Sequence, residues 1–311
     1  MSTQIPTFFV QQYSTNIELL LQQKGSKLRS YVTSGSHVGK AASPVDQICK
    51  IEAQLVTSRF SPMNRVDAPT DRRWVYPSDY DLPQLIDEFD RLRLVVDPNS
   101  QYVTNAGYAL GRKMDELLID AVLGTAKTGE TGGTSTAFDT ANEVDVAVGG
   151  ANSKLNVQKL KAVKEIAMSK NIDLDNDPLH IAVPAADYAA LWDEIQIVSG
   201  DFNGGGMVLK DGKIEQYLGI TFHHVELVET QAAGTNEVNL PVWTKSGLYL
   251  GLWNDIQTSI TKRNDIQGEP WQAYCKATFG ATRLDEDKVF NIAKDSIATI
   301  NNAVGHLARI T

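Results

Sequence analysis

The alternation of apolar and polar positions is most regular between Asp97 and Gly124. Apolar side chains recur there at steps of about 3.6 residues, which is the period of a helix with one buried face. The positions in this stripe are Val103, Ala106, Leu110, Leu117 and Ala121, widened by Tyr102, Ala109, Met114 and Leu118, with Lys113 and Glu116 on the opposite face. Ser100 is a suitable N-cap, and Gly124 suits the position just beyond the end. The pattern predicts a helix over 101–123, roughly 35 Å long, to which the rest of the chain is attached.

Upstream of this helix, residues 1–47 are predicted to form a short amphipathic helix and an extended arm. The helix would end at Gly25, and its apolar side could pack on its own domain or on a neighbouring chain. That side consists of Phe9, Val10, Tyr13, Ile17, Leu20 and Leu21. Residues 26–47 are polar, rich in Gly and Ser and locally basic. Gly35 to Ala41 resembles a nucleotide-binding loop, but the spacing is one residue short and Ala41 replaces the required Ser or Thr, so we exclude such a site.

Residues 48–83 predict a projecting hairpin. The segment 48–60 alternates as a strand does, 61–73 is a turn-rich charged tip, and 74–83 is extended, with Pro77 and Pro83 favouring the edge of a sheet. A solvated loop is the alternative, but long connections without secondary structure are usually functional. We therefore expect contacts with another subunit. The candidates are Arg59, Arg65, Arg72, Arg73 and Trp74 in the hairpin, and Asp87, Glu88 and Asp90 just after it.

The middle of the chain alternates strands and helices. Residues 125–150 form a Gly/Thr-rich connection with one strand-like piece, VDVAV at 144–148. A second amphipathic helix is predicted at 155–171, capped by Asn152 or Ser153. The segment 179–195 indicates a buried strand followed by a helix that Pro184 opens, and 219–228 another strand.

The last part of the chain is rich in strands. Strand patterns run from 238 to 294, with turns at Lys245–Gly247 and Asp265–Pro270, and we expect an antiparallel sheet that packs on the long helix. A final amphipathic helix is predicted from Ile297, Ile300, Val304 and Leu307.

Composition narrows the class of protein. The chain has 311 residues, an ordinary apolar fraction and no apolar run long enough for a membrane helix. The N-terminus lacks the features of a signal peptide, and two distant cysteines, Cys49 and Cys275, fit buried thiols in a reducing compartment. The formal charge of −9 argues against a sequence-reading DNA-binding protein, although it permits a wall that encloses DNA.

We identify no catalytic or metal-binding constellation in the sequence. The segment 173–177 resembles the start of a calcium loop, but Pro178 occupies the position of the required Gly. His223 and His224 are adjacent in a strand and point to opposite faces, and His37, His180 and His306 supply no ligand spacing. The carboxylates at 87–90 alternate with arginines, which is typical of a salt-bridged face. No catalytic residue, cofactor or metal is therefore predicted.

Several strings together resemble the major capsid proteins of tailed bacteriophages, which have the Hong Kong 97-type fold. The most specific runs from Arg72 to Gly124 (RRWVYPSDYDLPQLIDEF to DELLIDAVLG). Supporting strings are FFVQQYSTNIELLLQQKGSKLRSYV at 8–32, LHIAVPAADYAALW at 179–192, YLGITFHHVEL at 217–227 and ITKRNDIQGEPWQAYCKATFGATRLDEDKVFNI at 260–292. Together they cover most of the chain.

The resemblance implies an α+β capsid fold and a division of the chain into functional parts. These are an N-terminal arm at 1–47, an extended β-hairpin loop at 48–83, a peripheral domain at 84–149 with its spine helix at 100–124, an axial domain at 150–240, and peripheral return strands with a C-terminal helix at 241–311. The chain would self-assemble into the hexamers and pentamers of an icosahedral head enclosing double-stranded DNA. A separate scaffolding protein, a portal and a decoration protein are the implied partners, and the implied location is the virion, assembled in the host cytoplasm.

Two alternatives stay open on sequence alone. One is an encapsulin-like shell with the same fold around an enzyme cargo. The other is a soluble oligomeric α/β enzyme, which would need a pocket with a perturbed histidine or carboxylate.

Overall fold

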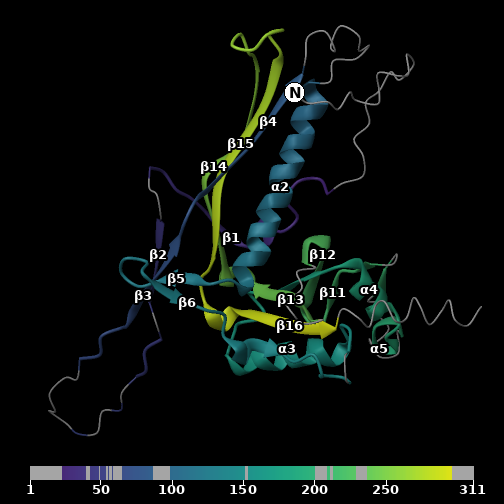
Figure 1. Ribbon diagram of the computed structural model, residues 1–311. Helices are drawn as coiled ribbons and strands as arrows, with labels where there is room; N and C mark the ends of the chain where they lie inside the picture. Colours follow the sequence, from purple (N-terminus) through teal and green to yellow (C-terminus); the bar gives the residue numbers. More distant parts are fainter. Residues whose placement is uncertain are drawn as a thin grey trace, which may run out of the picture.

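The computed structural model describes residues 23–39, 43–48, 50–53, 55, 58, 65–86, 99–150, 153–199, 209–210, 213–228 and 237–295. The fold is α+β. Its long helix, α2 (Asn99–Leu123), rises from a body of sheet and helices and runs beside the two longest strands, as Figure 1 shows. The helix predicted over 101–123 is thus confirmed.

Helix α2 buries one face from Ala106 to Val122. The buried apolar residues Ala106, Leu110, Met114, Leu118 and Val122 follow one another at four-residue steps, and Ile119 lies beside them. Leu117 and Ala121, which we placed in the stripe, are only half-buried. On the outer side Lys113 and Glu116 form an ion pair at 2.9 Å. The buried face is therefore turned slightly from the predicted one, because it meets strands on one side and the arm on the other.

A four-stranded sheet packs against α2. Its order is β1 (Thr33–Ser36), β14 (Leu248–Lys262), β15 (Trp271–Arg283) and β4 (Ser78–Ile86). The arm thus contributes a strand, β1, which runs parallel to β14. Strand β4 lies at the edge and contains Pro83, as predicted for a residue that cannot donate to a ladder. The free thiol of Cys275 is buried in β15, and burial raises its pKa; Cys49 lies outside the described residues.

A six-stranded sheet forms the centre of the body. Its order is β11 (Gln216–Tyr217), β12 (Ile220–His224), β8 (Leu179–Val183), β13 (Glu237–Thr244), β16 (Val289–Asp295) and β7 (Glu143–Val144). Strands β8 and β16 are buried at every position. Three helices belong to this part of the chain: α3 (Val157–Ser169), α4 (Ala185–Trp192) and α5 (Ile195–Val198). Pro184 precedes α4 as its N-cap, as the predicted strand–helix unit requires.

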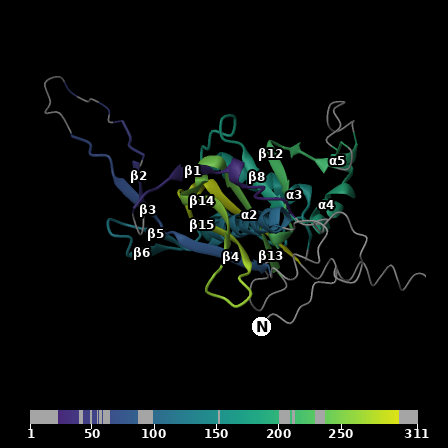
Figure 2. The same ribbon diagram turned by 90° about the horizontal axis from the view of Figure 1, so that it is seen from above.

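The small third sheet lies at the end of the molecule opposite α4 and α5, as the view from above shows (Figure 2). It contains β2 (Ser43–Ile48), β3 (Thr70–Val75), β5 (Ala126–Thr128) and β6 (Thr134–Thr136) in that order. The remaining elements are short: the 3₁₀ turns η2 (Arg29–Tyr31), η3 (Thr140–Asn142), η4 (Glu226–Val228), η5 (Lys245–Gly247) and η6 (Glu286–Lys288), and the pair β9 (Leu209–Lys210) and β10 (Lys213–Ile214).

The structure corrects the predicted first strand of the hairpin. The described residues 50–53 and 55 are not in a strand, and the strand that pairs with β3 is instead 43–48. Alternation in 48–60 indicated a strand, but a strand also needs a hydrogen-bonding partner. Strand β3 begins at Thr70, opposite Ile48, so the ladder between β2 and β3 stops there and does not extend to the described residues 50–53.

Other predictions need smaller corrections. Helix α3 is capped by Asn156, whose side chain accepts from the Lys159 amide, and not by Asn152 or Ser153. The connection 125–150 contains the hairpin β5–β6, which we missed. The closing strands are divided between two sheets, because β13 and β16 pair with each other and β13 also pairs with β8. A boundary at residue 240 would therefore fall inside β13. Residues 1–22 and 296–311, where most of the N-terminal helix and the whole C-terminal helix were predicted, lie outside the described residues.

Candidate assembly surfaces

Beyond β2 and β3 the chain leaves the body with apolar side chains uncovered. In Figure 1 this segment extends from the small sheet away from α2. Ile48 is 79% exposed and Leu55 is 87% exposed, and Ile51 and Val66 are also exposed. Single exposed apolar residues are ordinary, but several along one projecting segment are typical of a surface that another molecule covers.

Of the predicted contact arginines, Arg65 lies on this projection and Arg72 lies in β3, at its base. Arg72 pairs with Asp46 across β2 and β3, with Nε to Oδ1 at 2.5 Å and Nη2 to Oδ2 at 3.2 Å. This pairing lowers the pKa of the Asp46 carboxyl. Arg65 is exposed and lies 3.4 Å from Asp67. The other candidates, Arg59, Asp87, Glu88 and Asp90, lie outside the described residues.

Arg73 and Trp74, by contrast, hold the base of the hairpin to the body. Arg73 is 7% exposed, and its Nη1 donates to Glu286 Oε1 at 2.9 Å. The Trp74 indole Nε1 donates to the Gly129 carbonyl at 2.7 Å. Gly132, which has a positive φ of 74°, packs against the Trp74 ring, and a Cβ there would lie 3.0 Å from Trp74 Cγ. Both side chains thus serve contacts within the subunit.

The contact of Arg73 continues to the end of the spine helix through Arg283, which is fully buried. Arg283 Nη1 donates to the carbonyls of Val122 at 2.8 Å and Gly124 at 2.7 Å, and Arg283 Nε pairs with Glu286 Oε2. These carbonyls belong to the C-terminal end of α2, where the orphan acceptors and the helix dipole favour a cation. Glu286 therefore links the hairpin base to the spine helix through two arginines.

A second fastening joins the arm to the middle of α2. The buried Asp115 carboxylate accepts from the backbone amides of Lys27 at 2.9 Å and Leu28 at 3.2 Å, and from the side chains of Ser26 and Gln23. One turn earlier, Gly111 lets the arm approach closely, because a Cβ there would lie only 2.6 Å from Gly25 Cα. We missed this anchor, although Gly111 and Asp115 stand four residues apart within the apolar stripe and interrupt it.

The structure also brings together two histidines that the sequence analysis separated. His223 Nε2 lies 3.2 Å from His180 Nδ1, and the rings of Tyr31 and Trp243 lie beside them. Burial lowers the pKa of His180, and burial together with the neighbouring His180 lowers the pKa of His223 to about 4. The only signal in the sequence was that both lie in predicted strands. Since β8 and β12 pair in parallel, their register places these positions on one sheet face.

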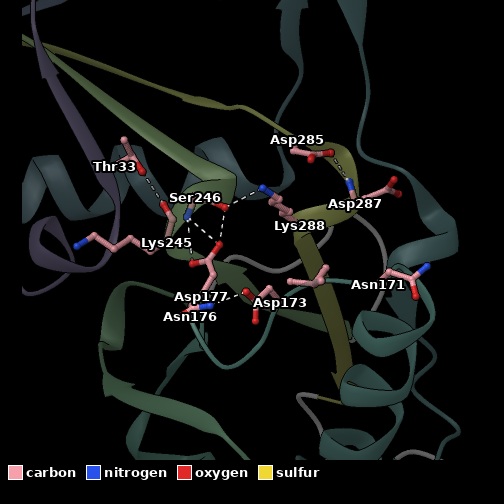
Figure 3. Close-up of a pocket in the computed structure, with 11 residues that line it drawn as sticks. Thr33, Asn171, Asp173, Asn176, Asp177, Lys245, Ser246, Asp285, Asp287 and Lys288 are labelled. Atoms are coloured by element: carbon pink, nitrogen blue, oxygen red, sulfur yellow. Dashed lines mark hydrogen bonds between the residues drawn. The ribbon is translucent and has the colours of Figure 1, made fainter. Parts of the chain in front are cut away.

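A polar pocket of about 560 Å³ lies between the turn after α3 and the turns η5 and η6 (Figure 3). Its side chains are largely used to hold these turns. Asp177 accepts from the Ser246 amide at 3.3 Å, Lys288 Nζ donates to Ser246 Oγ at 2.9 Å, and Asp173 accepts from Asn176 at 2.6 Å. Within the described part of the chain, no group of three or more His, Cys, Asp and Glu side chains is placed to hold a metal ion. The turn at 173–177 is thus a structural element of this pocket.

None of the helices that the structure describes is both long enough and apolar enough to cross a bilayer.

Comparison with known proteins gives a consistent family and fold. The sequence matches the family described as phage capsid protein over residues 5–295, whereas no curated protein matches it. Similar solved structures include the capsid of the cyanophage P-SCSP1u, with a TM-score of 0.68 and 15% identity over 92% of this chain and 93% of that chain. The cyanophage Pam1 capsid has a TM-score of 0.69 and 13% identity over 95% and 99%, and the capsid of Ralstonia phage GP4 has 0.64 and 12% over 92% and 94%.

At these identities the structural similarity establishes the fold, which is the Hong Kong 97-like capsid fold that the sequence resemblance implied. The family match establishes the class of protein, since it covers almost all of the described residues. It favours neither the nanocompartment nor the enzyme alternative. The chain belongs to the phage capsid protein family and is a structural major capsid protein.

Proposed function

We propose that many copies of this chain form the icosahedral head of a tailed bacteriophage around packaged double-stranded DNA. The observation that carries the proposal is the contrast within the hairpin. Its base is fixed to the spine helix through Arg73, Glu286 and Arg283, while its outer part leaves Ile48 and Leu55 uncovered. A rigidly based projection with uncovered apolar side chains is suited to lie on a neighbouring subunit.

In this proposal the neighbours bind through both apolar and charged groups. Ile48, Ile51, Leu55 and Val66 would be buried on the adjacent subunit, and each interface would exceed the roughly 1,000 Å² typical of stable complexes. Arg59, Arg65 and Arg72 would face the acidic residues Asp87, Glu88 and Asp90 of a neighbour. Such charge pairs set register and partner choice more than affinity.

The parts of the subunit would divide the work. The four-stranded sheet with α2 would be the peripheral domain, and the six-stranded sheet with α3, α4 and α5 would be the axial domain, whose loops meet around capsomer axes. The net charge of −9 suits an inner wall that encloses DNA without adhering to it. Assembly would take place in the host cytoplasm with a scaffolding protein and a portal, and a decoration protein could bind the finished virion.

The test is a subunit with a shortened hairpin. Residues 52–66 are replaced by a short Gly–Ser linker, which keeps β2 and β3 intact, and Arg65→Lys serves as the matched control because it keeps the charge and the projection. The shortened subunit should unfold at the same temperature as the control, since its core is unchanged, but should form no closed particles in negative-stain micrographs. Normal particles from the shortened subunit would contradict the proposal.

A further inference from the structure

The arm is held against the six-stranded sheet by a cluster of four rings, which we call the arm latch: Tyr31, His180, His223 and Trp243. The centroid of the Tyr31 ring lies 4.0 Å from that of His223 and 5.1 Å from that of His180. The Trp243 indole Nε1 donates to the Tyr31 carbonyl at 3.1 Å. The four residues come from η2, β8, β12 and β13, so the latch joins the arm to three strands of the sheet.

The two histidines of the latch face each other through ring nitrogens. His223 Nε2 and His180 Nδ1 lie 3.2 Å apart, so one nitrogen donates a hydrogen and the other accepts it. Only one of these two nitrogens can carry a hydrogen while the contact persists. A proton on both would place N–H against N–H and one cation against another in a largely buried site.

We propose that the His180–His223 pair is an acid-sensitive latch, which holds residues 28–36 of the arm on the sheet at neutral pH and releases them when both rings are protonated. The strands themselves cannot yield, because β8 and β12 are paired over five positions and β8 is fully buried. The Tyr31 side is the movable one: Tyr31 is 36% exposed and lies in a one-turn helix. Repulsion within the pair is therefore relieved by a ring moving into the space that Tyr31 occupies.

The surroundings of the pair offer little compensation for added charge. His180 is influenced by Asp177 and Lys245, which act in opposite directions, and His223 by His180 alone. The pocket next to His223 is lined by two cations, Lys27 and Lys213, together with Glu215 and His224. The Lys27 Nζ donates to the His224 carbonyl at 2.7 Å, which holds its positive charge in the pocket next to His223.

The direction of the pH effect follows from the lowered pKa values. With the arm docked, the histidine pair binds fewer protons than it does with the arm released. This difference holds between the ordinary histidine pKa of 6.5 and the pKa of about 4 for His223. The latch therefore stabilises the docked arm fully above pH 6.5, and this stabilisation is lost as the pH falls toward 4. His37, the histidine of the arm itself, contacts Tyr249 at 2.9 Å and lies outside the latch.

The experiment compares amide hydrogen exchange of residues 28–36 in the full chain and in the double variant His180→Asn, His223→Gln. Asn and Gln can keep a hydrogen bond at these positions but do not titrate. Each comparison is made at one pH, so that the intrinsic exchange rate cancels. At pH 7.5 both proteins should protect the arm equally. At pH 4.5 the native chain should have lost roughly 50- to 100-fold more protection than the variant, as linkage with a pKa of about 4 requires.

His224→Gln is the matched control, because His224 is the next residue, is half-exposed and pairs with Glu226 at 2.6 Å outside the latch. It should release its arm as the native chain does. Equal protection of the native chain and the double variant at pH 4.5 would overturn the proposal. If the double variant does not fold, ring NMR of the native chain decides: a ring that titrates below about pH 5 supports the latch, and two rings near 6.5 overturn it.

Discussion

Arg283 pairs with Glu286 three residues further along the chain, at the point where the last turn of α2 meets the end of β15. The same guanidinium donates to two carbonyls of the helix end and to the Thr136 carbonyl at 3.3 Å. Its charge is thus surrounded by acceptors in a site without exposure to solvent. A buried cation is tolerable only with such a full set of partners.

Replacing this cation should cost much more than replacing an exposed one. Arg283→Met should lower the free energy of unfolding by about 3–5 kcal/mol, because the helix carbonyls lose their donor and Glu286 loses one of its two arginine partners. Arg263→Met, which breaks an exposed pair with Asp265 at the β14–β15 turn, should cost much less, because water screens an exposed pair. Urea unfolding of the two variants measures the difference, and equal losses would contradict the role of Arg283.

Two glycines of α2 should respond in opposite ways to the same substitution. Gly111→Ala places a Cβ 2.6 Å from the arm backbone at Gly25 and should destabilise by about 1–3 kcal/mol. Gly107→Ala meets nothing within 4 Å and should stabilise by about 0.5–1 kcal/mol, since Ala restricts the unfolded chain and suits a helix. Thermal unfolding gives both signs, and stabilisation by Gly111→Ala would mean that the arm does not pack there.

The contacts of Asp115 with the arm should contribute more to the free energy of unfolding than the surface ion pair of Glu116, the next residue. Asp115→Ala leaves the amides of Lys27 and Leu28 without an acceptor and should cost about 1–3 kcal/mol, with faster amide exchange in the arm. Glu116→Ala removes only the partly exposed pair with Lys113 and should change stability by less than about 0.5 kcal/mol. Unchanged arm exchange in Asp115→Ala would contradict the anchor.

The buried Lys159 should make stability rise with pH in the alkaline range. Burial lowers its pKa from 10.5 to about 8, so between these values the unfolded chain binds the extra proton. The free energy of unfolding of the native chain, relative to Lys159→Met, should therefore increase from pH 8 to 10.5. At pH 7.5 the variant should itself be less stable than the native chain, because the Lys159 Nζ donates to the carbonyls of Ser153 and Ala293. A difference that is constant with pH would show that Lys159 stays charged.

The sequence predicted the spine helix and most closing strands because their patterns are long. The apolar period from Val103 to Leu118 continues over several turns despite Gly111 and Asp115, and the turns at 245–247 and 265–270 carry clear breakers. The first hairpin strand was misplaced because alternation describes side chains and says nothing of the partner that supplies hydrogen bonds. The segment 48–60 alternates, yet its described residues 50–53 and 55 are not in a strand, and strand pairing in this region stops at Ile48.

The contacts that hold the arm and the hairpin to the body could not be predicted from periodic patterns in the sequence. Glu286 lies more than two hundred residues after Arg73, and His180 lies 43 residues before His223. Each pair exists only because the sheets bring distant positions together. Asp115 was a signal of the arm contact within the sequence itself, because it lies on the apolar stripe of the helix. An unpaired carboxylate buried there would be costly, so its position indicates a polar partner from another part of the chain.

The place of β16 in the six-stranded sheet has a consequence for biosynthesis. This strand, the last that the structure describes, lies between β13 and β7 and is buried at all of its positions. In a nascent chain that does not yet extend to Asp295, β7 has no neighbouring strand in this sheet, and the edge of β13 that pairs with β16 is unpaired. Translation must therefore pass Asp295 before the six-stranded sheet can be completed.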